Sequence, residues 1–358
     1  VYACVTYTLM MMIYSLINVP YASLLGVMSV NPQTRTEFSS YRMTFAFGGS
    51  ILVLALVEPL TDFFSRMKLV DGLPSMAFGW QMAAVVFAVM ATCMFLLTFL
   101  WTKERIRPIL EKKSSLKSDL KDLGVNKPWW ILLGASVMVL VFNSLRDGAA
   151  VFYFKYYVEG ADLWSFSIMD ASLTLITIYL VLGQAFNIVG ILCVPALTRA
   201  IGKKLTFLSA MAVATVLSII FYFLPKDMVV AILSMQILIS FCAGIVSPLM
   251  WSMYADIADY SEWKTGRRAT GLIFSSSSMS QKLGWTIGGS LSGWLLFYFG
   301  FEANVVQTET ALTGICLMMS VLPACATLFS VLFISGYPLN EKKISEITKE
   351  LEVRRKEV

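Results

Sequence analysis

The segment SMAFGWQMAAVVFAVMATCMFLLTFLW, residues 75–101, contains no Asp, Glu, Lys or Arg. A helix of about 20 such residues crosses the roughly 30 Å hydrocarbon core of a bilayer. The whole chain shares this character, because 57% of its residues are hydrophobic and only 14% are charged. A soluble domain has about 25% charged residues. The sequence therefore predicts an all-α protein that crosses the membrane several times.

Similar apolar runs recur along the chain, separated by short polar loops and by one longer charged segment. We predict nine transmembrane helices, at 1–30, 43–65, 75–101, 129–157, 172–198, 204–224, 228–255, 270–299 and 310–336. The charged segment divides them into a group of three and a group of six. The predicted regions are the remainder of an N-terminal helix bundle (1–101), a middle loop (102–128), a C-terminal six-helix bundle (129–336) and a tail (337–358).

The positive charges predict the orientation of these helices. When 102–128 is placed in the cytoplasm, most of the 28 Lys and Arg residues fall on the same side, as the positive-inside rule requires. The C-terminus is then cytoplasmic, and the net charge of +5 reflects membrane topology rather than nucleic-acid binding. In the tail, Ile344, Ile347 and Leu351 recur at helical spacing, which predicts an amphipathic surface helix.

The residue types that carry metal, redox or hydrolytic chemistry are sparse. The chain has no histidine, and its six cysteines lie in apolar segments without a CxxC pair. This pattern predicts neither a metal site nor a disulfide. Because no nucleophile–base pair is recognisable either, we assign no catalytic residue and do not expect an enzyme.

Lys282 lies near the middle of the predicted span 270–299, where a charge is costly. The residues that share its helical face are small or polar: Gly271, Ser275, Ser278, Thr286, Gly289 and Gly293. Small residues at four-residue spacing often only allow helices to pack closely, which is the simpler interpretation for the glycines. For Lys282 we expect a place on a substrate or ion pathway, paired with a carboxylate.

Two further clusters combine charge with a helix boundary. The segment DIADYSEWKTGRR, 256–268, places three acids before three bases, and is either a solvated loop or a set of ion pairs that holds helix ends together. Near the start, Asn18 and Pro20 interrupt the first span. Arg42 opens the second span, where it could anchor the boundary or donate hydrogen bonds to a ligand.

NVPYASLL at 18–25, Arg35, YR at 41–42, DIADYSEWKTGRRATG at 256–271 and Lys282 together resemble one family. It is the glycoside–pentoside–hexuronide:cation symporters, the melibiose-permease-like branch of the major facilitator superfamily. The resemblance implies twelve helices in two bundles that give alternating access to a central cavity. The chain begins with Val1 inside an apolar run. We therefore expect it to hold helices four to twelve of that fold.

The resemblance also implies roles for individual residues. Lys282 corresponds to a lysine that links the cation and sugar sites, Arg42 to an arginine that contacts sugar hydroxyls, and Tyr14 to a neighbour of the cation site. The expected substrate-binding residues are Asn18, Arg42, Asn143, Arg146 and Lys282, and the expected neighbours of the cation are Tyr14, Ser278, Lys282 and Thr286. The expected cytoplasmic gate comprises Arg35, Asp256, Asp259, Glu262, Lys264, Arg267 and Arg268. The family's carboxylate partner for the lysine lies on helix two, outside this chain.

We therefore expect a monomeric transporter of the plasma (inner) membrane that carries a sugar or glycoside together with Na⁺ or H⁺, without another cofactor. Melibiose permeases have aspartate at the position of Asn18 and tryptophan at that of Ala22, so the sugar itself stays open. Two alternatives remain. One is a lysolipid or other amphiphile transporter of the same superfamily, and the other is a membrane sensor or scaffold that transports nothing.

Overall fold

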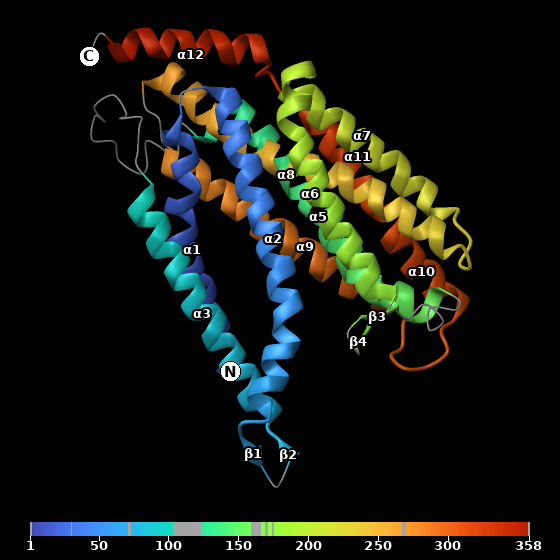
Figure 1. The fold of residues 1–358 in the computed structure, drawn as a ribbon. Coiled ribbons are helices and arrows are strands. Elements are labelled where there is room, and N and C mark those ends of the chain that lie inside the picture. The colour runs from blue at the N-terminus through green and yellow to red at the C-terminus, as the bar shows by residue number, and fades with distance from the viewer. Residues whose placement is uncertain are drawn as a thin grey trace. The chain divides into compact units, whose positions relative to one another are not determined.

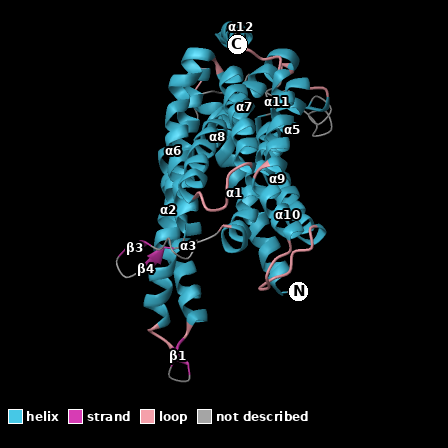
Figure 2. Ribbon diagram, turned by 90° about the vertical axis from the view of Figure 1, so that its right-hand side faces the viewer, coloured by secondary structure: helices cyan, strands magenta, loops and turns pink. Residues whose placement is uncertain are grey.

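The computed structural model describes residues 2–29, 31–70, 73–102, 123–158, 166–168, 171–173, 175–266 and 270–356. Its helices are α1 (Tyr2–Met28), α2 (Pro32–Ser65), α3 (Met76–Trp101), α5 (Lys127–Phe152), α6 (Leu175–Ile201), α7 (Lys203–Tyr222), α8 (Val229–Thr265), α9 (Thr270–Tyr298), α10 (Glu309–Met319), α11 (Val321–Ser335) and α12 (Glu341–Lys356). A π-helical turn, η1 (Tyr153–Tyr157), continues α5. Two short hairpins pair β1 (Leu69–Val70) with β2 (Leu73–Pro74) and β3 (Phe166–Ile168) with β4 (Ala171–Leu173). Helices dominate the chain (Figure 2), so the predicted all-α class is confirmed.

Seven described helical segments are long and apolar enough to cross a membrane: Val5–Leu25, Met76–Trp101, Lys127–Tyr157, Leu175–Ile201, Lys203–Tyr222, Val229–Thr265 and Glu309–Ser335. The predicted spans 43–65 and 270–299 are helical as well, within α2 and α9, but are not among these seven. In α9 the reason is the high content of serine and glycine around Lys282, which lowers the mean hydropathy. Such a helix needs protein neighbours for its polar face.

The chain divides into two compact units, Val1–Met43 with Ile106–Val358, and Thr44–Arg105. The predicted regions 1–101, 102–128, 129–336 and 337–358 follow a different division and stay predictions. In the smaller unit, Gly79 of α3 lies directly against α2, because a Cβ there would come within 2.4 Å of the Thr61 carbonyl oxygen. Ser75 caps the N-terminus of α3 by accepting a hydrogen bond from the Phe78 N–H.

In the larger unit, α8 lies at the centre of the bundle and packs against α6, α7, α9 and α12 (Figure 1). Every residue from Pro248 to Asp259 is buried. This stretch includes Trp251 and Tyr254, and its two carboxylates, Asp256 and Asp259, are buried with it. Buried charges require partners of opposite sign. The central helix therefore presents its acids to neighbouring elements rather than to solvent.

The contact between α5 and α9 corrects our interpretation of the glycines in α9. A Cβ added at Gly271 or Gly293 would meet nothing within 4 Å, and one at Gly289 only a side-chain oxygen at 4.0 Å. In contrast, a Cβ at Gly284 would lie 2.4 Å from Leu140 Cβ, and one at Gly288 would lie 2.5 Å from Ser144 Cβ. The close approach therefore uses Gly284 and Gly288, which have the same four-residue spacing but lie on another face of the helix.

This contact predicts opposite effects for the same substitution at two positions. Gly284→Ala should destabilise the protein by about 1–3 kcal/mol, because the new methyl group overpacks against α5. Gly293→Ala is the matched control and should be neutral or slightly stabilising, because it adds a methyl group to open space in a helix. Thermal unfolding of the detergent-solubilised variants measures both. Equal melting temperatures for the two variants would show that α5 and α9 do not pack as described.

The C-terminal helix α12 covers the end of the bundle at which α7 begins and α8 ends (Figure 1). The predicted amphipathic residues Ile344, Ile347 and Leu351 are 5, 4 and 1% exposed, and they pack into the protein core. The Trp263 indole N–H of α8 donates to Glu350 Oε2 over 2.6 Å. The expected tail helix is therefore present, but its apolar face rests on the bundle rather than on a membrane surface.

Candidate functional site

A cavity of about 480 Å³ lies between α1 and α9. Its nine lining residues are Tyr7, Met11, Tyr14 and Asn18 from α1 and Ser278, Gln281, Lys282, Trp285 and Thr286 from α9. On each helix they recur at three- and four-residue spacing, so each set occupies one face. Five predicted site residues thus come together: Tyr14, Asn18, Ser278, Lys282 and Thr286. We call this cavity the Lys282 pocket; the functional roles of its residues stay predictions.

The Lys282 side chain links α9 to α1. Its Nζ donates a hydrogen bond to Ser15 Oγ, and Ser15 Oγ in turn donates to the Met11 carbonyl oxygen over 2.5 Å. Nearby on α1, Asn18 Nδ2 donates to Tyr14 Oη over 3.3 Å. Within the described part of the chain, no ion pair joins Lys282 to a carboxylate. The ammonium group is therefore held by a neutral hydroxyl.

Sequence reasoning missed four lining residues of the pocket and the partner of the lysine. Tyr7 and Met11 lie seven and three residues before Tyr14, and Gln281 and Trp285 flank Lys282. The helical period would have indicated the first two, because residues at such spacings share a face. Ser15 carries no comparable signal, since its contact with Lys282 depends on how α1 is rotated towards α9.

Arg42 lies between two aromatic rings rather than in the Lys282 pocket. Its guanidinium carbon is 4.7 Å from the centre of the Tyr21 ring and 4.2 Å from that of Trp251, within the range of cation–π attraction. Trp251 is stacked on Phe274, with centroids 6.3 Å apart. The Arg42 Nη1 atom is buried and has no hydrogen-bond partner among the described residues. A buried donor without a partner is unfavourable, and substrate binding by Arg42 stays a prediction.

Arg146 does not line the Lys282 pocket, and neither does Asn143. The buried Arg146 guanidinium donates to the Met319 carbonyl oxygen over 2.6 Å, to Tyr179 Oη over 2.9 Å and to Gln236 Oε1 over 2.8 Å. The Met319 carbonyl lacks its usual helical partner because residue 323 is a proline without an N–H. Arg146 thus joins α5 to α6, α8 and α10. Substrate binding by Arg146 and Asn143 stays a prediction.

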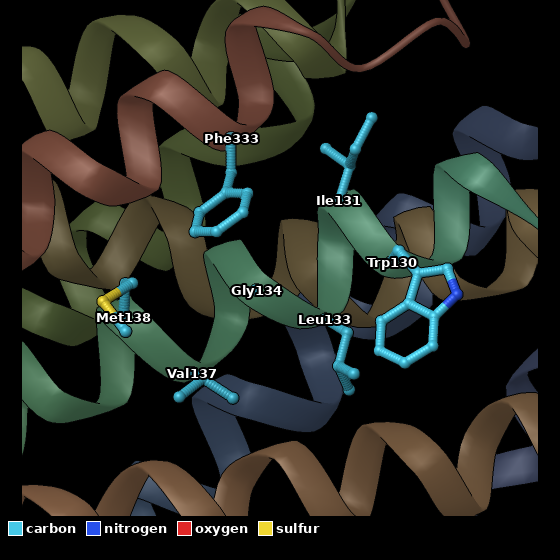
Figure 3. A pocket seen from close by; sticks show the side chains of 7 residues that line it. All are labelled: Trp130, Ile131, Leu133, Gly134, Val137, Met138 and Phe333. Carbon is cyan, nitrogen blue, oxygen red and sulfur yellow. The ribbon is translucent and has the colours of Figure 1, made fainter.

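A second cavity, of about 360 Å³, lies between α5 and α11 (Figure 3). Its lining residues are Trp130, Ile131, Leu133, Gly134, Val137, Met138 and Phe333. They offer a single polar hydrogen, the Trp130 indole N–H, which already donates to the Gly124 carbonyl oxygen over 2.9 Å. This apolar cavity has no free hydrogen-bonding side chain for a sugar.

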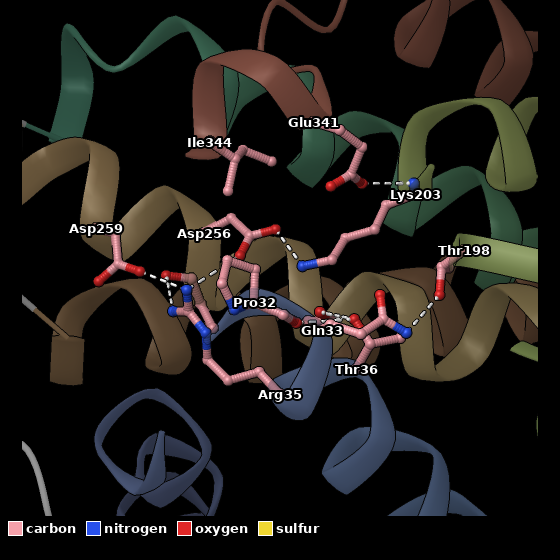
Figure 4. A network of polar contacts seen from close by, with 12 residues as sticks. Pro32, Gln33, Arg35, Thr36, Thr198, Lys203, Asp256, Asp259, Glu341 and Ile344 are labelled. Atoms are coloured by element: carbon pink, nitrogen blue, oxygen red, sulfur yellow. Dashed lines mark hydrogen bonds and ion pairs between the residues drawn. The ribbon is translucent and has the colours of Figure 1, made fainter. Parts of the chain in front are cut away.

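Three of the predicted gate residues, Arg35, Asp256 and Asp259, belong to a buried ionic network at the α12 end of the bundle (Figure 4). Arg35 is 0% exposed, and its Nη2 lies 2.5 Å from Asp259 Oδ2 and 3.4 Å from Asp256 Oδ1. Its Nη1 donates to the Ala255 carbonyl oxygen over 3.1 Å. Lys203 Nζ lies 2.5 Å from Asp256 Oδ2. We call these four ionic side chains, from α2, α7 and α8, the Arg35 network.

Neutral hydrogen bonds also join the first turns of α2 to α8 and to α6. Thr36 Oγ1 and Ser252 Oγ are 2.8 Å apart, and Ser39 Oγ donates to the Pro248 carbonyl oxygen over 2.7 Å. Gln33 Nε2 donates to the Pro195 carbonyl oxygen of α6 over 3.1 Å. Together with the Arg35 network, these contacts join α2 to α6, α7 and α8 at this end of the bundle.

The pKa of Arg35 follows from the balance of two effects. Burial by itself lowers the pKa of a guanidinium, but the charges of Asp259 and Asp256 outweigh burial and hold the Arg35 pKa above its ordinary value. Arg35 therefore stays charged at every physiological pH. The network does not open through deprotonation of its arginine.

The network contains one basic residue that the expected gate lacked. The expected gate combined Arg35 with the acids and bases of 256–268, and Arg35 does pair with Asp256 and Asp259. Lys203, which was not among the expected residues, pairs with Asp256 as well, and all of these ion pairs are buried. Lys264 is exposed beside the Tyr260 ring, while Glu262 is buried on α8. Arg267 and Arg268 lie outside the described residues.

The tail helix α12 contacts the backbone of Lys203. Glu341, the first residue of α12, accepts a hydrogen bond from the backbone N–H of Lys203 over 2.8 Å. A carboxylate at a helix N-terminus is favourable because unpaired N–H groups and the helix dipole point towards it. Glu341 thereby fixes the start of α7. The tail helix and the Arg35 network therefore both contact Lys203, the first residue of α7.

Comparison with known proteins identifies the family. A family model described as "MFS/sugar transport protein" matches residues 1–341. The chain is 33% identical to the isoprimeverose transporter of Lactiplantibacillus pentosus, over 88% of this chain and 62% of that protein. It is 30% identical to the glucuronide carrier protein homolog of Escherichia coli K12, over 99% of this chain and 74% of that protein. This chain belongs to the glycoside–pentoside–hexuronide:cation symporter family of the major facilitator superfamily. A further symporter-family relative, the putative glycoside/cation symporter YagG of E. coli K12, is 29% identical over 98% of this chain and 72% of its own length.

A solved structure supports the fold of this symporter-family chain. The crystal structure of the major facilitator superfamily transporter FucP in the outward conformation matches with a TM-score of 0.59 at 13% sequence identity. The match covers 90% of this chain and 72% of FucP. At that identity the likeness shows the shared fold alone. The fold inferred from the sequence resemblance is therefore confirmed.

Proposed function

We propose that the protein containing this chain is a secondary transporter that moves a sugar or glycoside together with Na⁺ or H⁺ by alternating access. The Lys282 pocket carries the proposal, because amide, hydroxyl, ammonium and aromatic groups from two helices line one cavity. Sugar sites combine such polar groups with an apolar ring surface. Relatives named for isoprimeverose, glucuronide and glycosides support the substrate class.

The Arg35 network supports alternating access. It closes the end of the bundle at which α2 begins, whereas the Lys282 pocket lies further along α1 and α9. In the proposed orientation that closed end faces the cytoplasm together with the C-terminus. The network then acts as the cytoplasmic gate in its closed state, and the substrate enters from the opposite side of the plasma membrane.

We propose roles for individual side chains according to the hydrogen-bond donors that they carry. Asn18 and Arg42 hydrogen-bond the sugar, and the unpartnered Nη1 of Arg42 supports its part. Lys282 connects the sugar with the cation, whose other neighbours are Tyr14, Ser278 and Thr286. We propose a monomer that needs a coupling ion but no other cofactor.

Equilibrium binding to the purified full-length protein tests the coupling. A radiolabelled glycoside should bind several-fold more tightly when the coupling ion is present, supplied as Na⁺ or as a lower pH. Coupling is reciprocal, so the glycoside should tighten binding of the ion by the same factor. If the glycoside affinity is the same at every Na⁺ concentration and every pH, symport is excluded.

A further inference from the structure

Arg146 is a buried cation in the membrane-spanning part of α5. A charge at such a depth is costly unless protein groups bind it. Its guanidinium donates to three oxygens on three other helices, namely the carbonyl of Met319 on α10, the phenol of Tyr179 on α6 and the amide of Gln236 on α8. The ring of Phe221 on α7 lies 5.2 Å from the guanidinium carbon and adds cation–π attraction.

The bond to Met319 lies at the break between α10 and α11. Ser320 separates the two helices, with φ −127° and ψ −87°. Pro323, one turn after Met319, has no N–H to donate, and a proline ring clashes with the carbonyl four residues before it in a regular helix. Arg146 Nη1 lies 2.6 Å from the Met319 oxygen, as short as charge-assisted hydrogen bonds are. Arg146 therefore supplies, from another helix, the hydrogen bond that Pro323 cannot make.

Close packing between α6 and α8 places the acceptor on Gln236. A Cβ at Gly183 of α6 would lie 2.7 Å from Gln236 Nε2 and 3.3 Å from Ser240 Oγ. The glycine thus leaves room for the Gln236 amide, whose oxygen accepts from Arg146 over 2.8 Å. The surroundings of the guanidinium are therefore fixed by the packing of α6 on α8 as well as by the break after α10.

The opposite side of α5 contacts the helix that carries the Lys282 pocket. Ser144 lies two residues before Arg146, which places it about 160° away around the helix. Ser144 Oγ donates to the Trp285 carbonyl oxygen over 3.3 Å, and its Cβ would lie 2.5 Å from a Cβ at Gly288. Trp285 lines the Lys282 pocket. Because α5 lies between Arg146's partners and α9, a displacement of α5 moves this wall of the pocket.

We propose that Arg146 is a positioning residue for the Lys282 pocket and not a sugar ligand. It replaces the backbone hydrogen bond that is missing at Pro323. It thereby holds α5, and through α5 the α9 wall of the pocket, in place against α6, α8 and α10. The effect on the pocket rests on the proposed transport function, whereas the bond to Met319 does not.

Thermal unfolding of the detergent-solubilised full-length protein tests the bond. Arg146→Met should lower the melting temperature by at least about 5 °C, because three buried oxygens lose their donor. In a Pro323→Ala background the same substitution should lower it by at most about half as much, because the new N–H bonds the Met319 carbonyl. Pro195→Ala in α6 is the matched control. It restores an N–H far from Met319 in the sequence, so Arg146→Met should cost as much there as in the unmutated protein.

Arg146→Lys serves in the same cycle if Arg146→Met does not fold. A lysine keeps the charge, but its ammonium lacks the planar fork that reaches all three acceptors. Its loss in melting temperature should also shrink when Pro323→Ala is added. A loss that is equal with and without Pro323→Ala would overturn the bond.

Hydrogen exchange of the same full-length variants tests the positioning. Arg146→Lys should speed amide exchange severalfold at 317–322 and also at 284–290 of α9, and Pro323→Ala should slow both again. A purely local role predicts a change at 317–322 alone. Peptides from α3 should exchange as before, because α3 belongs to the other compact unit. Unchanged exchange at 284–290 would overturn the positioning of the pocket.

Sugar uptake separates this inference from the proposed function. Loss of uptake in Arg146→Lys with unchanged melting temperature and exchange would indicate direct contact with the sugar. That result overturns the positioning role and leaves sugar transport standing. If the unmutated protein transports no sugar, the proposed function fails, and the melting-temperature cycle still decides whether Arg146 replaces the bond missing at Pro323.

Discussion

Replacing Arg35 with methionine should open the end of the bundle that the Arg35 network closes. The substitution removes a cation that lies within ion-pair distance of both Asp256 and Asp259, and both carboxylates are buried. Removing one partner from a buried ion pair costs about 3–5 kcal/mol, because the remaining charge stays desolvated. Only the closed state bears this cost. We therefore expect the population of the open state to rise at least a hundredfold, since each 1.4 kcal/mol is a factor of about ten.

Thiol labelling at Ser39 measures this opening. Ser39 is buried between α2 and α8 in the closed state. A Ser39→Cys variant, made in a background whose natural cysteines are replaced by serine, should react at least a hundredfold faster when Arg35→Met is added. The matched control is Arg199→Met, which removes an ion pair with Glu37 at the same end. The Arg199 side chain is 64% exposed, and exposed pairs contribute only about 0–1 kcal/mol. Similar labelling rates for the two variants would show that the Arg35 network does not hold this end closed.

Lys282→Ala should reduce cation-driven sugar uptake to the level of vesicles that lack the protein. The substitution removes the charge of the pocket and the hydrogen bond from α9 to Ser15 of α1. Hydrogen bonds to charged groups contribute about 1.5–3 kcal/mol, and in the proposed mechanism the Lys282 ammonium contacts the sugar and also lies beside the coupling ion. We therefore expect loss of uptake beyond tenfold with normal membrane insertion.

Lys155→Ala is the matched control for this loss. Lys155 is an exposed lysine that donates to Asn304 Oδ1 over 2.9 Å, outside the Lys282 pocket. Uptake by Lys155→Ala should equal that of the unmutated protein when expression levels are matched. If Lys282→Ala also transports at the unmutated rate, Lys282 has no part in coupling.

Helical periodicity made part of the site predictable. Ser278, Lys282 and Thr286 recur at four-residue spacing, so they had to share one face of α9. Tyr14 was expected from the family resemblance, not from helical periodicity. The identity of the facing helix does not follow from spacing. For this reason Ser15, the actual partner of Lys282, was not predicted.

Spacing along one helix does not identify the facing helix, and this explains why the packing glycines of α9 and the contact of Asp256 with Lys203 were not predicted. Gly284 with Gly288, and Gly289 with Gly293, have equal spacing, and only the position of α5 decides which pair allows close packing. The acids of the Arg35 network were recognisable from their placement at a helix end. Lys203, which pairs with Asp256, lies 53 residues before it on α7, and only the tertiary fold brings the two together.

Accumulation of sugar against its own gradient tests cation-coupled transport most directly. Sealed vesicles containing the full-length protein are given equal sugar concentrations inside and outside and an inward gradient of Na⁺ or H⁺. We predict that the internal concentration rises above the external one and falls back when an ionophore collapses the ion gradient. Internal sugar that stays equal to the external concentration under both ion gradients would contradict symport.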